Sequence, residues 1–142
     1  MKVVVLDERA VQYQPYCAHL DHDIVFYDAM PNLEGGLPCD VMLASPGLAA
    51  EALKAGASPR WIQSTWAGVD TLLPLLAGSN IRLTGIKGIF GQLMSEYVFA
   101  HILSDLRDLT FFADQQSTQQ WTERLPGTLA GKTMVLVGTG SI

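Results

Sequence analysis

Short apolar runs alternate with polar, glycine-containing and proline-containing segments over the first two-thirds of the chain. Five of these runs have the unbroken apolar character of strands covered on both faces, at 2–6, 23–27, 40–44, 61–64 and 81–84. Helical patterns lie between them, at 11–20, 49–55 and 71–76. Strands that alternate with short helices predict parallel pairing through right-handed crossovers. We therefore expect an α/β fold over residues 1–90, built as a flavodoxin-like doubly wound parallel sheet.

Glycine and aspartate mark the expected helix boundaries in this part of the chain. Gly56 follows the helical pattern at 49–55 and provides a C-terminal stop. Asp70 precedes the pattern at 71–76 and is placed to cap that helix.

The pattern changes near residue 91. The segment from Gln92 to about Gln120 contains no Gly or Pro. Apolar residues recur there at helical spacing, at Phe99, Ile102, Leu103, Leu106, Leu109 and Ala113. One helix of this length would extend about 40 Å, which is more than a small lobe can cover. We expect residues 91–125 to form a long helix that connects two lobes or packs on a second subunit.

The last segment carries the sharpest chemical signal. After a turn at Pro126-Gly127, an apolar run at 133–137 leads directly into Gly138-Thr139-Gly140-Ser141-Ile142. A strand followed by Gly-x-Gly is how a dinucleotide-binding βαβ unit begins, because the glycines allow a tight turn and close approach of a pyrophosphate. The alternative is an ordinary glycine turn. We expect residues 126–142 to be the first part of a truncated Rossmann domain that binds NAD or NADP, with the rest of that site lying outside this chain.

Two further segments are candidates for a binding site. In the segment 64–70, backbone N–H groups of Ala67 and Gly68 are placed to face a carboxylate at the end of a strand. The alternative, favoured by the residues alone, is a plain turn from strand to helix with Asp70 as a cap. The segment 88–98 is either a cleft wall or a loop whose Leu93 and Met94 side chains belong to the core.

Composition and charge exclude several classes of protein. Of the 142 residues, 49% are hydrophobic and 16% are charged, too apolar for a disordered chain. No apolar run approaches the roughly 18 residues of a membrane span. The formal net charge is −5 and the basic residues are scattered singly, so we expect no nucleic-acid partner.

We expect no secretory leader and two reduced thiols, Cys17 and Cys39, as in a cytoplasmic protein. His19 and His22 lack further ligands at metal-site spacing, so we expect no metal.

Taken in order, the motifs resemble the D-isomer-specific 2-hydroxyacid dehydrogenases, in particular the glyoxylate/hydroxypyruvate reductase-like members. The matching segments are Trp66-Ala67-Gly68-Val69-Asp70, Phe90-Gly91 with Met94-Ser95-Glu96-Tyr97-Val98, Gln115-Gln116 followed by Trp121, and Leu129-x-Gly131-Lys132-Thr133 leading into Gly138-x-Gly140-x-Ile142. The resemblance covers essentially the whole chain.

The resemblance implies an NAD(P)-dependent oxidoreductase with two doubly wound lobes that reduces small 2-oxo acids. It implies that Ala67 and Gly68 bind the substrate carboxylate and that Met94 lies near the nicotinamide. It also assigns the pyrophosphate loop to Gly138, Thr139, Gly140, Ser141 and Ile142, and a homodimer contact to the long helix. The catalytic Arg, Glu and His of the family follow the Gly-rich loop, so we expect no catalytic residue in this chain and no activity of the fragment.

A second hypothesis is a non-catalytic, flavodoxin-like module that binds a small acid or a partner. If the chain is instead the N-terminal part of a dehydrogenase, the apolar residues in 92–142 lack the rest of the second lobe, which would normally cover them. We therefore expect dimers, domain exchange or disorder through that segment.

Overall fold

The computed structural model describes residues 1–32 and 36–140. Its contacts divide the chain into two compact units, Met1–Ile86 and Lys87–Ile142. The second unit combines the long helical segment with the segment that follows it. In the described ranges, no helix is both long and apolar enough to cross a membrane.

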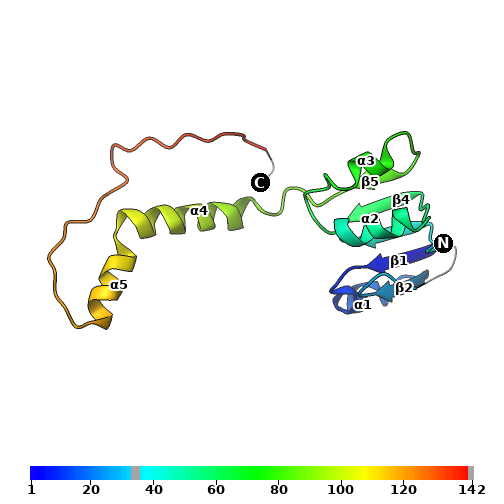
Figure 1. Cartoon of the computed structure of the whole chain (residues 1–142), viewed down its shortest axis with the longest axis horizontal. Coiled ribbons are helices and arrows are strands. Elements are labelled where there is room, and N and C mark those ends of the chain that lie inside the picture. Colours follow the sequence, from blue (N-terminus) through cyan, green and yellow to red (C-terminus); the bar gives the residue numbers. More distant parts are fainter. Residues whose placement is uncertain (33–35, 141–142) are drawn as a thin grey trace. The chain divides into compact units, whose positions relative to one another are not determined.

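The first unit contains a five-stranded parallel sheet (Figure 1). Its strands are β1 (Lys2–Leu6), β2 (Asp23–Tyr27), β3 (Val41–Ala44), β4 (Trp61–Ser64) and β5 (Arg82–Thr84). The order across the sheet is β2-β1-β3-β4-β5, which is the order of flavodoxin-like folds. The predicted α/β fold with a doubly wound parallel sheet is confirmed.

Short helices connect these strands: η1 (Ala10–Tyr13), α1 (Gln14–Cys17), α2 (Pro46–Lys54) and α3 (Leu73–Leu76). The helix predicted over 11–20 is instead a 3-10 turn followed by one α-helical turn. Pro15 lies in the first turn of α1, where its missing N–H is tolerated. Gly56 has φ +94° just after α2, as its predicted role as a helix stop requires.

The predicted cap at Asp70 is wrong. Leu72 is the N-cap of α3, and no side chain donates or accepts a capping hydrogen bond there. The backbone passes through a turn closed by Leu72 N–H donating to Val69 O before the helix begins. Asp70 therefore lies too early in the chain to cap α3.

The core lies between one face of the sheet and α2, which lies over the strands in Figure 1. Alternate strand residues point to this face. The fully buried members are Val4, Leu6, Met42, Ala44 and Ile62 from the strands, and Ala49 and Ala52 from α2. Small alanine side chains let the helix approach the sheet closely.

The second unit begins with two helices, α4 (Gly91–Leu106) and α5 (Leu109–Ser117) (Figure 1). The prediction of a single long helix over 91–125 is therefore wrong. The helical segment is interrupted after Leu106, and it ends at Ser117. Asp108 has left-handed backbone angles, φ 53° and ψ 37°, which interrupt the helix.

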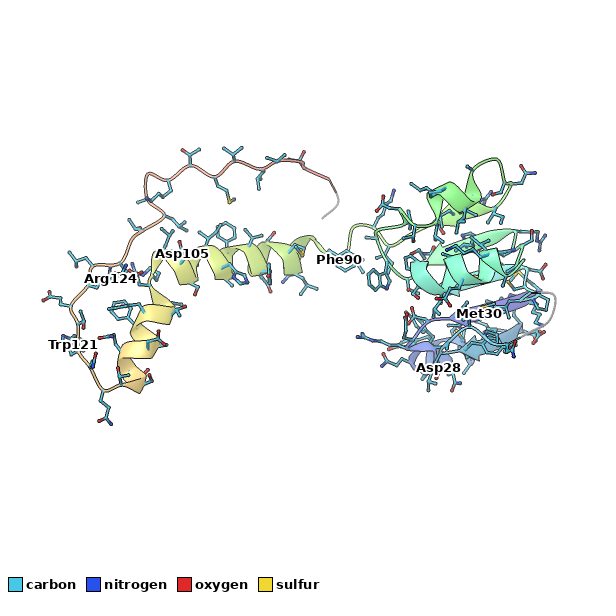
Figure 2. All side chains as sticks on the ribbon, in the orientation of Figure 1. Asp28, Met30, Phe90, Asp105, Trp121 and Arg124 are labelled. Atoms are coloured by element: carbon cyan, nitrogen blue, oxygen red, sulfur yellow. The ribbon has the colours of Figure 1, made fainter. Side chains whose placement is uncertain are left out.

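Contacts with the following segment stabilise this corner. The Arg124 Nε lies 3.1 Å from Asp108 Oδ2, and the Arg124 guanidinium lies 4.8 Å from the centre of the Phe111 ring. Arg107 donates a 3.3 Å hydrogen bond to the Gly127 carbonyl. Figure 2 shows Arg124 on the segment that passes this corner.

The strand predicted at 133–137 is absent from the described residues. Val135 and Val137 are 80% and 98% exposed. A strand needs a neighbour to pair with its N–H and C=O groups, and the described part of the second unit has no other strand.

Candidate functional site

The loop that leaves β4 is organised by the buried hydroxyl of Ser64. Ser64 Oγ accepts a 3.0 Å hydrogen bond from Trp66 N–H and donates a 2.9 Å bond to the Trp66 carbonyl. This small hydrogen-bonded turn leads directly into the peptide groups of Ala67 and Gly68. The Trp66 side chain itself is 62% exposed.

A buried carboxylate fixes the start of the same loop. Asp7, which is 5% exposed, follows β1 directly. Asp7 Oδ2 accepts a 2.7 Å hydrogen bond from Thr65 Oγ1, and Oδ1 accepts a 3.0 Å bond from Arg9 N–H. Both oxygens of the buried Asp7 side chain are therefore paired, which offsets the cost of its burial.

The loop packs closely against Gly85, which follows β5. A Cβ added at Gly85 would lie 3.2 Å from the Trp66 carbonyl oxygen and 3.7 Å from that of Ala67. Ile86 N–H donates a 3.4 Å hydrogen bond to the Trp66 carbonyl. The segment after β5 thus holds the loop closely.

The loop presents two backbone donors that have no partner in the described part of the chain. No hydrogen bond found among residues 1–32 and 36–140 uses the N–H of Ala67 or Gly68. Ala67 is half-buried and Gly68 is exposed. Adjacent N–H groups at the carboxyl end of a parallel sheet are suited to binding an oxyanion.

Gly68 opens onto a cavity of about 410 Å³. The cavity lies where β1, β3 and β4 end and where α2 begins. Its lining consists of Glu8, Ser45, Pro46, Gly47, Trp66, Gly68, Asp70 and Thr71. The structure therefore brings one of the two predicted carboxylate-binding residues into a cavity, with Ala67 next to it in the loop.

Glu8 and Ser45 were not identified as candidates from the sequence. Ser45 is 3% exposed and is the N-cap of α2, yet its side chain caps no helix N–H. Its Oγ instead donates a 3.4 Å hydrogen bond to Glu8 Oε1. The available signal was that each residue closely follows a predicted strand, where parallel sheets bind ligands.

The predicted cofactor residues belong to the second unit. Met94 lies in the first turn of α4, is 39% exposed, and donates its N–H to the Phe90 carbonyl at 2.9 Å. Phe90 is labelled just before α4 in Figure 2. A groove of about 510 Å³ lies between α4 and the segment 129–134, and neither Met94 nor the Gly-rich segment lines it.

The Gly-rich segment does not form a phosphate cradle in the described residues. Gly138 has φ +92°, which suits a tight turn, but no strand precedes it. A Cβ added at Gly138 or Gly140 would meet no atom within 4 Å, so no close packing requires glycine there. Thr139 is exposed, and Ser141 and Ile142 lie outside the described residues. Residues 138–140 alone therefore form no dinucleotide site, and we derive no chemical step through one.

Within the described ranges, no three His, Cys, Asp or Glu side chains are grouped so as to hold a metal ion. His101 packs against Tyr97 one turn earlier in α4, with ring centres 4.4 Å apart.

Comparisons with solved structures relate this chain to dehydrogenases. A D-isomer specific 2-hydroxyacid dehydrogenase family protein from Aeromonas salmonicida matches with a TM-score of 0.85 and 36% identity, over 99% of this chain and 46% of that chain. A family protein of the same description from Klebsiella pneumoniae matches with a TM-score of 0.67 and 24% identity, over 92% of this chain and 42% of that chain. An NAD-dependent formate dehydrogenase from Staphylococcus aureus, solved in complex with NAD, matches with a TM-score of 0.62 and 19% identity, over 86% of this chain and 42% of that chain.

The resemblance to the D-isomer-specific 2-hydroxyacid dehydrogenase family is therefore confirmed, and with it the relation to oxidoreductases. The chain spans a little under half the length of the solved structures it matches. No protein-family model and no curated protein matches it.

Proposed function

We propose that this chain supplies the carboxylate-binding lobe of an NAD(P)-dependent D-2-hydroxyacid dehydrogenase. The whole enzyme would interconvert a small 2-oxo acid and its 2-hydroxy acid, of the glyoxylate and hydroxypyruvate class. The observation that carries this proposal is the pair of N–H groups at Ala67 and Gly68, which have no hydrogen-bond partner among the described residues. Their loop is fixed by the hydrogen bonds of Asp7 and Ser64 and by close packing against Gly85. The Aeromonas salmonicida neighbour supports the reaction class.

In this proposal, the chain binds and orients the acid, and no residue of the chain transfers a proton or hydride. The N–H groups of Ala67 and Gly68 donate to the two oxygens of the substrate carboxylate, and the cavity beside Gly68 receives the rest of the molecule. The NAD in the Staphylococcus aureus neighbour supports a nicotinamide cofactor, which would supply the hydride when bound. The choice between NAD and NADP stays open.

Titration of the ¹⁵N-labelled 142-residue chain with glyoxylate tests the carboxylate site. We expect progressive shifts of the Ala67 and Gly68 amide resonances and little change at Gly78, which does not line the cavity. Absence of shifts at Ala67 and Gly68 would refute the proposal. Acetate, which lacks the 2-oxo group, provides the control for carboxylate binding alone.

We also propose that the chain alone is inactive, because hydride transfer needs groups that its described residues do not supply. Glyoxylate or hydroxypyruvate with NADH or NADPH should show no turnover above a protein-free blank. Appreciable turnover would contradict this expectation.

A homodimer through α4 and a cytoplasmic location are further parts of the proposal. Large apolar side chains on α4 are exposed in this chain, among them Leu93 at 64%, Tyr97 at 60% and Phe99 at 45%. A patch of this kind favours association. Sedimentation velocity should show a dimer at micromolar concentration, and a monomer at every concentration would contradict it.

A further inference from the structure

The cavity beside Gly68 has an acidic lining with a weakly capped helix at its edge. Glu8 and Asp70 both line it, and the described lining contains no Lys or Arg. Asp70 Oδ2 lies 4.0 Å from where a Cβ on Gly68 would stand. Glu8 lies on the other side, where α2 begins.

The start of α2 would normally attract an anion. Gly47 and Leu48 are in its first turn, and no hydrogen bond among the described residues uses their N–H groups. Unpaired N–H groups and the helix dipole together favour negative charge at such an end. Ser45, the N-cap, leaves these groups without a side-chain acceptor.

Glu8 supplies the negative charge at this end from within the chain. Glu8 is exposed, and its Oε1 accepts a long hydrogen bond of 3.4 Å from Ser45 Oγ, which places the carboxylate beside the N-cap of α2. A second carboxylate brought to the same place by a substrate would meet a like charge, which is destabilising even when partly screened by water.

We propose that Glu8 makes this site selective for monocarboxylates. The inference rests on the proposed function, since it takes the loop at Ala67 and Gly68 as the subsite for the 2-oxo acid carboxylate. Glu8 then places a negative charge beside the cavity that would receive the far end of the substrate. The far end of the substrate must therefore be neutral. Pro46 and the exposed Trp66 line the part of the cavity that receives this end. Acids with a small hydroxyl or alkyl end fit, and dicarboxylates are disfavoured.

Two five-carbon acids test the inference, 2-oxopentanoate and 2-oxoglutarate, which differ in a terminal methyl or carboxylate. Their affinities for the 142-residue chain are measured from the Gly68 amide shift at constant ionic strength. We expect 2-oxopentanoate to bind more tightly to the unmodified chain. In Glu8→Gln, we expect 2-oxoglutarate to bind about 2- to 5-fold more tightly, the range expected for an anion at a freed helix N-terminus. The affinity for 2-oxopentanoate should stay within experimental error.

Glu51→Gln is the matched control, because it removes the same charge from an exposed position of α2 that does not line the cavity. It should leave the ratio of the two affinities unchanged. An unchanged ratio in Glu8→Gln, or tighter binding of 2-oxoglutarate by the unmodified chain, would overturn the selectivity while leaving the carboxylate loop intact. Absence of any Gly68 shift with either acid would overturn the loop itself, and the selectivity with it.

Discussion

Asp7 and Thr65 are joined by a 2.7 Å hydrogen bond across the carboxyl end of the sheet. They follow β1 and β4, which are separated by β3 in the sheet order. The bond therefore ties the beginning of the loop at Ala67 and Gly68 to a strand that is not adjacent to β4 in the sheet. Asp7 is almost completely buried, so water would not easily replace the Thr65 hydroxyl as a donor to its carboxylate if that hydroxyl were removed.

Thr65→Val should lower the free energy of unfolding by about 1–3 kcal/mol, because it leaves one oxygen of a buried carboxylate without a donor. Urea denaturation followed by tryptophan fluorescence measures this loss. Thr65→Ser retains the hydroxyl and should recover most of the stability. Thr71→Val, at an exposed position, should change the stability by less than about 0.5 kcal/mol. Equal stability of Thr65→Val and the unmodified chain would show that the bond contributes nothing.

Two glycines of the first unit should respond in opposite directions to alanine. Gly36 has φ +88°, and an added Cβ would lie 2.8 Å from the Ala55 carbonyl oxygen. Gly36→Ala should therefore lose about 1–3 kcal/mol through backbone strain, with further loss from the close contact. Gly47 lies within α2, and an added Cβ meets no atom within 4 Å. Gly47→Ala should gain up to about 1 kcal/mol from the better helix propensity of alanine. Thermal unfolding of both variants measures the difference, and an unchanged stability of Gly36→Ala would argue against the positive φ and the close contact at Gly36.

Cys39 should make the stability of the first unit depend on alkaline pH. Burial raises the pKa of its thiol, with a smaller contribution from the negative charge of Asp40, which Lys2 opposes. The folded state therefore favours the neutral thiol. The resulting stability is fully present below the ordinary thiol pKa, and it is lost as the pH rises through the raised value.

Urea denaturation at several pH values, from neutral to strongly alkaline, measures this dependence. Cys39→Ser carries no titrating thiol and should lose less stability than the unmodified chain over the alkaline range. Burial also raises the pKa of Tyr13, but this contribution is common to both proteins and cancels in the comparison. Parallel pH profiles of the two proteins would contradict the role of Cys39.

The strands were predictable because each one is a local pattern of apolar residues. The five predicted runs coincide with β1 to β5 to within one residue at either end. The stop at Gly56 was equally local, since it depends on one backbone conformation that glycine adopts without strain. The flavodoxin-like class followed from the alternation of strands and helices together with general rules for parallel crossovers.

The break between α4 and α5 was not predictable from periodicity, because the helical spacing continues through it. The left-handed conformation of Asp108 is accompanied by its ion pair with Arg124, 16 positions later in the chain. Likewise, the apolar run at 133–137 has the composition of a strand, but composition supplies no neighbouring strand. Both outcomes depend on contacts with residues that are distant in sequence.

The sequence by itself determined the α/β class, the position of the loop at Ala67 and Gly68, and the family resemblance, because these depend on short local patterns. Only the tertiary structure decided which side chains surround that loop. Glu8, Ser45 and Gly68 come from three separate strand ends, and they line one cavity because β1, β3 and β4 are adjacent and parallel. The acidic lining of the cavity is thus a property of the sheet order, which no single segment of the sequence contains.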